Sequence, residues 1–241
     1  MISVRTKLYF SMENLILQQF FVFTFPERHD KMYSYLYFSF LRGQTMDSNF
    51  FALISRMRYI ARWGLMRNAL PENIQEHSHM VAVLAHALGV IRRDIFHQPC
   101  DVNALATAAL YHDASEILTG DLPTPIKYHN AEIMSAYHAV EDLAVQKLLG
   151  MLPPELRETY ADVLAEDKDG DIYPLVKAAD KLSAYIKCIE ERKAGNNEFL
   201  SAEAQTRAAL EASPLPEVQY FLEHFIPAFE RDLDELGAIG Q

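Results

Sequence analysis

Two imidazoles and two carboxylates in this sequence have the chemistry to bind one divalent metal ion: His77, His112, Asp113 and Asp180. Four nitrogen and oxygen donors, or fewer together with water, suit manganese, iron, cobalt, nickel or zinc. Calcium prefers a shell made of oxygen atoms alone. The alternative is a buried hydrogen-bonded cluster, but two neighbouring buried carboxylates are costly without a cation. These residues therefore predict a transition-metal site without choosing the metal.

The segment around His112 and Asp113 supplies a third useful group, the carboxylate of Glu116. If the segment is a helix, successive residues turn by about 100°, so Glu116 lies about 40° and Asp113 about 100° from His112. The three side chains then project over one quadrant, which places Glu116 beside the metal to handle the attacking water. The alternative roles for Glu116 are a solvated helix position or a hydrogen bond that orients His112.

Arg62 and Trp63 carry groups that suit a nucleotide site. The guanidinium of arginine binds phosphate oxygens in pairs, and an indole gives a flat wall for a nucleoside. An adjacent arginine and tryptophan more commonly form a cation-π contact or lie at the rim of a site. Arg67 and Lys127 are further candidate cations, for which a solvated surface position is an equally good interpretation.

Helices must position these side chains, because apolar residues recur with a helical period almost everywhere from residue 48 onward. Asn73, followed three residues later by Glu76, forms a capping-box pattern that starts a helix just before His77. The loop over 120–125 contains two prolines and cannot continue the preceding helix. The expected helices cover about 50–63, 73–96, 101–118, 131–149, 154–165, 173–194, 198–212 and 216–236.

The composition fits one all-α domain, since 241 residues of which 50% are hydrophobic can bury one good core. The net charge of −11 disfavours a nucleic-acid polymer as partner, because phosphate backbones favour clustered lysine and arginine. A small phosphate ester is compatible with this charge when a metal and local cations offset it. Cys100 and Cys188 lie in apolar helical patterns, which predicts reduced core residues of a cytosolic protein.

The first 45 residues differ from the rest of the chain. They hold 11 of the 27 aromatic residues and carry a net charge of +2, against −13 for the remainder. Their apolar stretch over 15–25 is too short to span a bilayer, and no signal-peptide cleavage site follows it. We therefore expect no membrane partner, an atypical extension over residues 1–45, and a native start at Met46 for a domain covering 46–241.

The order His…His-Asp…Asp resembles that of the HD-domain metal-dependent phosphohydrolases. Residues 48–236 further resemble the bacterial 5′-deoxynucleotidases of the YfbR-like family. A lone His-Asp dipeptide is a weak signal, whereas six segments in the same order are a specific one. The segments that carry the resemblance are Arg62–Asn68, Glu72–Ser78, Tyr111–Glu116, Thr119–Lys127, Val176–Asp180 and Ala194–Phe199.

The resemblance implies a single-domain HD-type helical bundle with its metal site between helices. It implies that a cytoplasmic homodimer hydrolyses deoxyribonucleoside 5′-monophosphates to deoxyribonucleoside and phosphate, using one divalent transition metal such as cobalt or manganese. The metal ligands would be the four residues identified above, and the catalytic residues would be Glu116, Asp121 and Arg62. Asp121 could instead be a simple turn residue, since Gly-Asp before Leu-Pro is common in turns.

In the resembling family Arg62 would orient the phosphate, and Trp63 would crowd the sugar so that 2′-deoxyribose is favoured over ribose. The residues implied in substrate binding are Arg62, Trp63, His77, Asp113, Asp121, Leu122, Pro123, Thr124 and Asp180.

Two other functions use the same ligand set. An HD-type phosphodiesterase or nucleotide triphosphohydrolase typically needs more cations for its longer phosphate chain than this sequence supplies near the site. A nonhydrolytic nucleotide-binding protein that keeps the metal for stability would be favoured if Glu116 or a ligand were missing, and none is.

Overall fold

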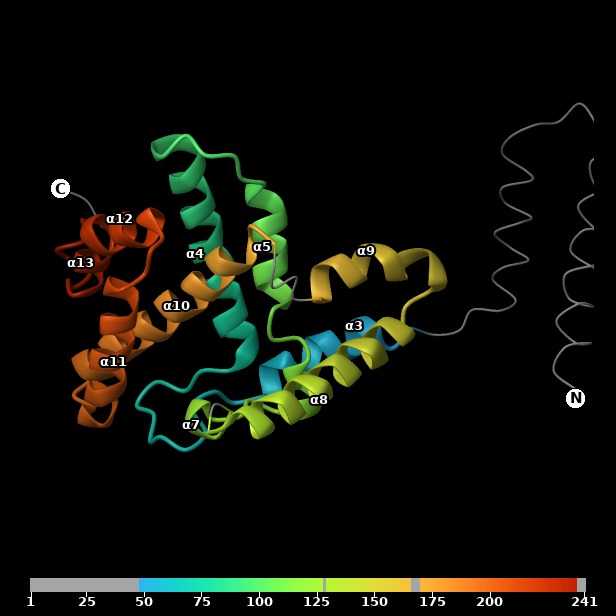
Figure 1. Ribbon diagram of the computed structural model, residues 1–241. Helices are drawn as coiled ribbons and strands as arrows, with labels where there is room; N and C mark the ends of the chain where they lie inside the picture. Colours follow the sequence, from blue (N-terminus) through green and yellow to red (C-terminus); the bar gives the residue numbers. More distant parts are fainter. Residues whose placement is uncertain (1–47, 128, 166–169, 238–241) are drawn as a thin grey trace, which may run out of the picture. The chain divides into compact units, whose positions relative to one another are not determined.

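A bundle of α-helices forms the computed structural model, which describes residues 48–127, 129–165 and 170–237 (Figure 1). Within these ranges no β-strand occurs, and an isolated β-bridge joins Ala61 to Asn73. The all-α prediction is confirmed. The extension expected over residues 1–45 and the start at Met46 lie outside the described residues. None of the described helices is both long and apolar enough to cross a bilayer.

The helices follow the predicted order, with shorter elements between them. The long helices are α4 (Ile74–Val90), α5 (Val102–Tyr111), α8 (Ala131–Gly150), α9 (Pro154–Leu164), α10 (Tyr173–Lys193), α11 (Leu200–Glu211) and α12 (Pro216–His224). The short ones are α3 (Phe50–Ile54), α6 (Glu116–Thr119), α7 (Thr124–Lys127) and α13 (Ile226–Phe229). A π-helical turn over Ile91–Ile95 extends α4, and 3-10 turns occupy Ser55–Tyr59 and Asn197–Phe199.

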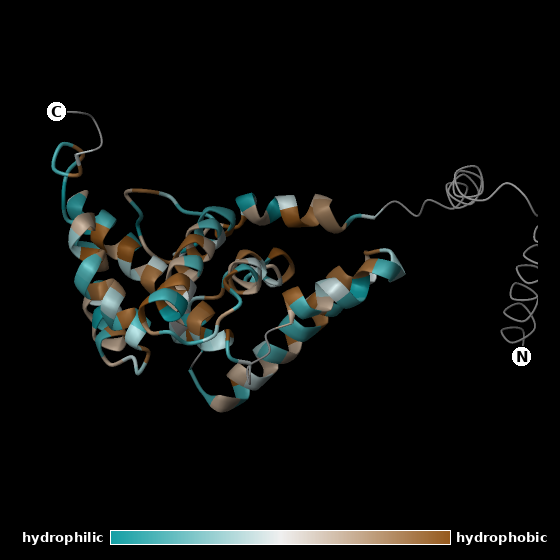
Figure 2. Cartoon of the chain, turned by 90° about the horizontal axis from the view of Figure 1, so that it is seen from above, coloured by the Kyte–Doolittle hydropathy of each residue, from teal (hydrophilic) through white to brown (hydrophobic). Residues whose placement is uncertain are grey.

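The main core lies where α4 packs against α5 and α10 (Figure 1). Leu88 of α4, Leu105 of α5 and Leu182 of α10 are completely buried there. Figure 2 shows hydrophobic residues alternating with hydrophilic ones along the helices, so each helix has an apolar side to bury. Because α4 directly contacts both α5 and α10, polar side chains at neighbouring positions on these three helices can come together.

A second, smaller apolar cluster joins α3, α8 and α9 around the turn that follows α5. Its buried members are Phe50, Ala114, Leu148, Leu152 and Leu164. Ala114 directly follows His112 and Asp113 in the chain, so packing of Ala114 into this cluster anchors the turn that carries the His-Asp pair.

The predicted capping box at the start of α4 is confirmed. The Asn73 side chain accepts hydrogen bonds from the backbone N–H groups of Gln75 and Glu76 at 3.0 and 3.1 Å, and the Glu76 carboxylate accepts one from the Asn73 N–H. These bonds satisfy backbone donors that have no partner within the helix. The start of α4 is thereby fixed, and His77 lies in its first turn.

The first expected helix, 50–63, is shorter than predicted. After α3 and the 3-10 turn, the chain becomes extended at Ile60, with φ −96° and ψ 108°. Trp63 then has a φ of 57°, in the left-handed region that a bulky residue rarely adopts. Arg62 and Trp63 therefore lie in a loop before α4 and not at the end of a helix.

The last expected helix, 216–236, is divided in two and ends earlier, at Phe229. α12 ends at His224 and α13 spans Ile226–Phe229. Pro227 explains the interruption, because proline has no N–H to donate and its ring clashes with the carbonyl one turn earlier. Periodicity alone did not reveal this break, since the apolar spacing continues across it.

Candidate active site

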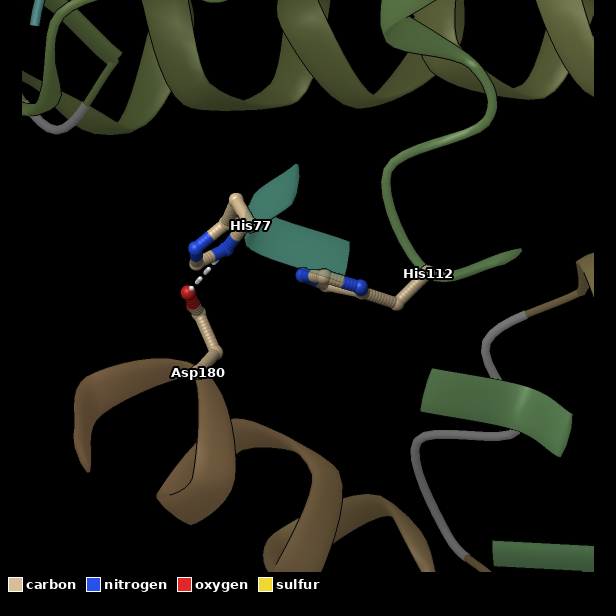
Figure 3. A group of neighbouring side chains, drawn as sticks. All are labelled: His77, His112 and Asp180. Carbon is tan, nitrogen blue, oxygen red and sulfur yellow. Dashed lines mark ion pairs between the residues drawn. The ribbon is translucent and has the colours of Figure 1, made fainter. Parts of the chain in front are cut away.

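Three of the four predicted metal ligands converge between α4, the end of α5 and α10. His77 comes from the first turn of α4, His112 follows α5, and Asp180 comes from α10; their side chains point toward one another (Figure 3). The potential ligand atoms of these residues all lie within 4.8 Å of one another. The Nε2 atom of His77 is 3.0 Å from Oδ1 of Asp180. A group of this kind can hold a divalent metal between three segments of the chain.

Hydrogen bonds at the far side of each imidazole orient the two histidines. The Nδ1 atom of His112 lies 2.8 Å from the carbonyl oxygen of Ala109, to which it can only donate. The Nδ1 atom of His77 pairs with the Ser183 hydroxyl at 3.2 Å. Both Nε2 atoms are buried and face carboxylates: Nε2 of His77 faces Asp180, and Nε2 of His112 faces Asp113. Imidazole nitrogens that converge with carboxylates in this way fit a metal ion well.

Asp113, the fourth predicted ligand, lies against both histidines. Its Oδ2 atom is 3.1 Å from Nε2 of His112, 3.5 Å from Nε2 of His77 and 3.4 Å from Nη1 of Arg62. Burial alone would raise the pKa of Asp113, but the surrounding His112, His77 and Arg62 hold it below its ordinary value. Asp113 is therefore an anionic link between the histidine pair and Arg62.

Asp180 and His112 influence each other's protonation. Burial would raise the pKa of Asp180, but His77 and His112 lower it below its usual range. Burial would lower the pKa of His112, but Asp113 and Asp180 raise it. The carboxylates thus stay ionised, and they attract positive charge to the space between the two rings.

The His-Asp pair does not lie within a continuous α-helix, contrary to the prediction of one helix over 101–118. α5 ends at Tyr111, and the backbone N–H groups of Ala114 and Glu116 donate to carbonyls only three residues earlier, at 2.9 and 3.0 Å. Such bonds give three residues per turn, so the angles expected for an α-helix do not apply here. The spacing of apolar residues does not predict the end of α5 at Tyr111, because it stays similar across the turn that follows.

Glu116 begins α6 and is buried, with 6% of its surface exposed. Burial, followed by the negative charges of Asp113 and Asp121, raises the pKa of Glu116 to about 10. Its Oε2 atom has no hydrogen-bond partner among the described residues. The expected alternative of a solvated helix position is therefore wrong. This carboxyl group is placed in an acidic, water-poor environment of the kind that tunes acids and bases for catalysis.

The loop predicted over 120–125 is present after α6, but it ends before Thr124. Asp121, Leu122 and Pro123 are half-buried, and burial raises the pKa of Asp121 against the lowering effect of Arg62. The loop is shorter than the expected 120–125, because α7 starts at Thr124 and has Pro125 in its first turn, where proline is tolerated. The side chain of Thr124 lies outside the described residues.

Arg62 and Trp63 meet at one carboxylate that the sequence did not single out, that of Glu72. The Glu72 Oε2 atom accepts a hydrogen bond from the Trp63 indole at 3.1 Å and lies 3.4 Å from Nε of Arg62. The indole packs on the Phe199 ring, with centroids 5.2 Å apart. Glu72 has no spacing signal, since its position follows from the path of the loop before α4.

Side chains of α10 also bind the backbone of the loop that follows Trp63. The Glu191 carboxylate is completely buried and accepts hydrogen bonds from the backbone N–H groups of Ala69 and Leu70, at 2.8 and 3.0 Å. Lys187 pairs with Glu191 at 2.5 Å and donates to the Leu70 carbonyl. Asn196 adds another bond to Glu191 at 2.8 Å. The backbone that follows Trp63 is thus tied to the helix that carries Asp180.

The two further candidate cations form ion pairs with carboxylates other than the candidate metal ligands. Arg67 is 87% exposed at its side chain and lies 3.4 Å from Glu198. Lys127 pairs with Glu141 of α8 at 2.8 Å and lies over the Tyr137 ring. Arg62 is the arginine that the structure brings to the candidate ligands, with 13% of its side chain exposed.

Known proteins resemble this chain over most of its length. Residues 49–229 match the family described as 5′-deoxynucleotidase YfbR-like. Proteins named 5′-deoxynucleotidase YfbR from Shigella boydii and Escherichia coli are each 50% identical over 192 residues, which cover 79% of this chain and 96% of each relative. An HD-domain phosphohydrolase from Listeria innocua superimposes with a TM-score of 0.68 and 25% identity, over 77% of this chain and 90% of that one.

The fold also recurs in a protein from Pyrococcus horikoshii, with a TM-score of 0.58 and 21% identity. That likeness covers 76% of this chain and 98% of the archaeal one.

Proposed function

Because the chain belongs to the YfbR-like 5′-deoxynucleotidase family, we infer that it is a phosphoric monoester hydrolase that splits deoxyribonucleoside 5′-monophosphates into deoxyribonucleoside and phosphate. The observation that carries this inference is the meeting of His77, His112 and Asp180 within 4.8 Å, with Arg62 linked to the histidines through Asp113. Metal-ligating donors and a phosphate-binding cation thereby share one site.

His77, His112 and Asp180 would hold one divalent transition metal, with Asp113 as a fourth ligand. The buried Nε2 atoms of the two histidines, which face the carboxylates of Asp180 and Asp113, support this assignment. When bound, such a metal supplies positive charge that polarises the phosphoryl group and promotes ionisation of the attacking water. Cobalt or manganese suits this mixture of imidazole and carboxylate donors, as other first-row divalent metals do.

Arg62 binds the phosphate of the substrate. Its guanidinium lies 3.4 Å from Asp113 at Nη1 and 3.4 Å from Glu72 at Nε, which leaves donors of the same planar fork for phosphate oxygens. An arginine fixed on two sides loses little freedom when it binds, so the phosphate is oriented as well as attracted.

Glu116 and Asp121 handle the protons of the reaction. Glu116, in its ionised form, accepts the proton of the attacking water, and positive charge brought close to it lowers its raised pKa toward the working range. Asp121, whose pKa is raised by burial, donates a proton to the departing 5′-oxygen. Two carboxyl groups in different surroundings can thereby act as base and acid at one pH.

Trp63 forms the wall that the sugar meets, with Leu122 and Pro123 continuing the lining; Thr124 is a substrate-binding residue only by the family resemblance. An indole packed against C2′ leaves no room for a hydroxyl and offers it no acceptor, so ribose would be excluded by contact and by an unpaired polar group. Rejection of ribonucleotides therefore depends on a firmly held ring.

We further propose that the enzyme is a cytoplasmic homodimer that binds neither membranes nor nucleic-acid polymers. Several large apolar side chains of α8 and α9 are exposed, among them Val140, Leu143 and Leu156. A second copy covering them would remove this apolar surface from water. The net charge of −11 favours small phosphate esters over polyanions.

Release of inorganic phosphate from a panel of substrates tests the function. We expect release from dAMP and other deoxyribonucleoside monophosphates, and much less from AMP, dATP or a cyclic dinucleotide. A chelator should abolish release, and cobalt or manganese should restore it. Release of tripolyphosphate from dATP would show that the enzyme is a triphosphohydrolase instead. Phosphate release that persists in the presence of the chelator would show that the reaction does not require a metal.

A further inference from the structure

The Glu72 carboxylate lies where three residues of the site meet. Its Oε2 atom accepts a hydrogen bond from the Trp63 indole N–H at 3.1 Å and is 3.4 Å from Nε of Arg62. Its Oε1 atom is 3.9 Å from Nδ1 of His77. The Glu72 side chain is only 16% exposed, so these contacts are largely shielded from water. A single carboxylate thus touches a proposed phosphate-binding residue, a proposed sugar wall and a candidate metal ligand.

The backbone brings Glu72 to this point. The N–H of Arg62 donates to the Glu72 carbonyl at 3.0 Å, and the N–H of Ile74 donates to the Ile60 carbonyl at 3.0 Å. These two bonds pair the segment before the loop with the segment that enters α4. Glu72 is therefore held directly opposite Arg62, and its side chain can reach Trp63, the residue that follows Arg62.

Trp63 needs such a support, because its backbone has a φ of 57°, which is unfavourable for a side chain of this size. Its carbonyl accepts a hydrogen bond from the Met66 N–H at 2.8 Å and one from the Asn68 side chain at 3.3 Å, which fix the backbone. Phe199 supports one side of the ring. The bond to Glu72 fixes the remaining freedom, the direction in which the indole N–H points.

We propose that Glu72 is a positioning residue that sets the sugar preference of the enzyme by fixing the plane of the Trp63 indole, and that it holds Arg62 with the same oxygen. This proposal rests on the proposed function only in assigning the sugar to Trp63. The hydrogen bond is charge-assisted and partly buried, so its loss frees a ring that would otherwise stay in one orientation.

Replacement of Glu72 separates its two contacts. Glu72→Gln keeps an oxygen acceptor for the indole but removes the charge that faces Arg62, so KM should rise for both sugars while their ratio of kcat/KM stays unchanged. Glu72→Ala removes both contacts, and the preference for dAMP over AMP should fall by about tenfold, as expected for one charge-assisted hydrogen bond.

The fluorescence of Trp63 gives a readout that does not depend on activity, because this is the only tryptophan in the chain. Glu72→Ala should lower the steady-state anisotropy of its emission and increase its quenching by acrylamide, whereas Glu72→Gln should change neither. Glu190→Gln is the matched control. It removes the negative charge of an exposed glutamate that interacts electrostatically with Glu72, and it leaves the Glu72 contacts with Trp63 and Arg62 in place. Circular dichroism of each variant confirms that it is folded.

Trp63→Phe keeps a flat ring but removes the N–H donor, so it tests the route of the effect. Adding Glu72→Ala to Trp63→Phe should lower the sugar preference little further, because the contact is already gone. Unchanged anisotropy in Glu72→Ala, or a Glu72→Gln variant that loses the sugar preference equally, would overturn the proposal. If the wild-type enzyme hydrolyses AMP and dAMP equally, the proposed role of Trp63 fails, and the anisotropy still decides whether Glu72 fixes its ring.

Discussion

At His77 the contacts of the imidazole ring decide which of its nitrogens is available to a metal. Ser183 occupies Nδ1, and Nε2 is left facing Asp180 and Asp113. His112 is arranged in the same way, with Ala109 at Nδ1. Orientation of a ligand by the bond at its other nitrogen makes the site ready for a metal before one arrives, which lowers the entropic cost of binding.

Removal of one ligand should greatly weaken metal binding. Asp180→Ala leaves two histidines and Asp113 to hold the ion with one negative charge fewer, so affinity should fall by at least about 100-fold, more than is typical for losing a supporting contact. Elemental analysis after dialysis measures the bound metal. Asp162→Ala, at an exposed carboxylate of α9, is the control that should keep its metal; full metal content in both proteins would refute the assignment of Asp180.

Glu116→Gln should separate chemistry from binding. The amide matches the size of the buried carboxyl group, so metal content and KM should stay close to those of the wild type. Loss of the base should lower kcat by about 10² to 10⁴. Steady-state kinetics with dAMP gives both values. A variant with wild-type kcat would leave Glu116 with a purely structural role.

The sequence predicted part of this site, and tertiary contacts account for the rest. The order His…His-Asp…Asp and its resemblance to the HD-domain phosphohydrolases singled out His77, His112 and Asp180, and the structure brings these three residues together. Glu72 was not singled out, since the sequence contains many glutamates and only the path of the loop before α4 brings this one to Trp63. The left-handed backbone of Trp63 likewise has no signal, because glycine is the usual marker of that conformation.

Among the elements, helix starts were easier to predict than helix ends. Asn73 caps α4 as expected, and Asp101 caps α5 at the predicted start of that helix, because both side chains accept hydrogen bonds from N–H groups in the first turn. The end of α5 at Tyr111 was not foreseen, since a chain that changes from four-residue to three-residue hydrogen bonding keeps a similar apolar spacing. That change matters here because it sets the directions of His112 and Asp113.

The hydrogen bonds from the loop after Trp63 to Glu191 of α10 predict that the stability of the fold depends on pH. Burial would raise the pKa of Glu191, but hydrogen bonds from Lys187, Asn196 and the loop backbone hold it at about 2, below the ordinary 4.5. A lowered pKa stabilises the fold fully above about pH 4.5, and this contribution is lost as the pH falls toward 2. Glu191→Gln should therefore cost about 3 kcal/mol at neutral pH.

Urea denaturation of wild type and Glu191→Gln over the same pH range measures the difference in the free energy of unfolding. The difference should be constant above about pH 5 and shrink as acid protonates Glu191 in the wild type. Glu190→Gln, one position earlier and exposed, should change stability by less than about 0.5 kcal/mol. A difference that does not change down to pH 2 would mean that Glu191 stabilises the fold through something other than its charge.

For the molecule as a whole, the strong negative charge and the exposed apolar residues of α8 act in opposite directions. A net charge of −11 makes copies of the chain repel one another, so apolar contact must outweigh this repulsion for a dimer to form. The dimer should therefore become more stable as salt screens the charge. Sedimentation at low and high salt tests this dependence.

Leu143→Glu should dissociate the proposed homodimer. Leu143 is 63% exposed on α8, and a carboxylate placed there would be buried unpaired against the second copy. Analytical ultracentrifugation should show the mass halved relative to wild type. Leu200→Glu makes the same change at an exposed leucine of α11 and should leave the dimer intact; wild-type protein that sediments as a monomer would rule out this arrangement.

Asp180, Ser183, Lys187 and Glu191 are spaced so that they share one side of α10. Residues seven and eleven positions after Asp180 return to within about 20° of it around a helix. Inserting or deleting one residue between Ser183 and Lys187 would rotate the second pair away by about 100° and separate the metal ligand from the anchor of the Trp63 loop. This helix can change its side chains over evolutionary time, but it cannot change its length by one residue there. We expect such insertions and deletions to be absent from functional relatives.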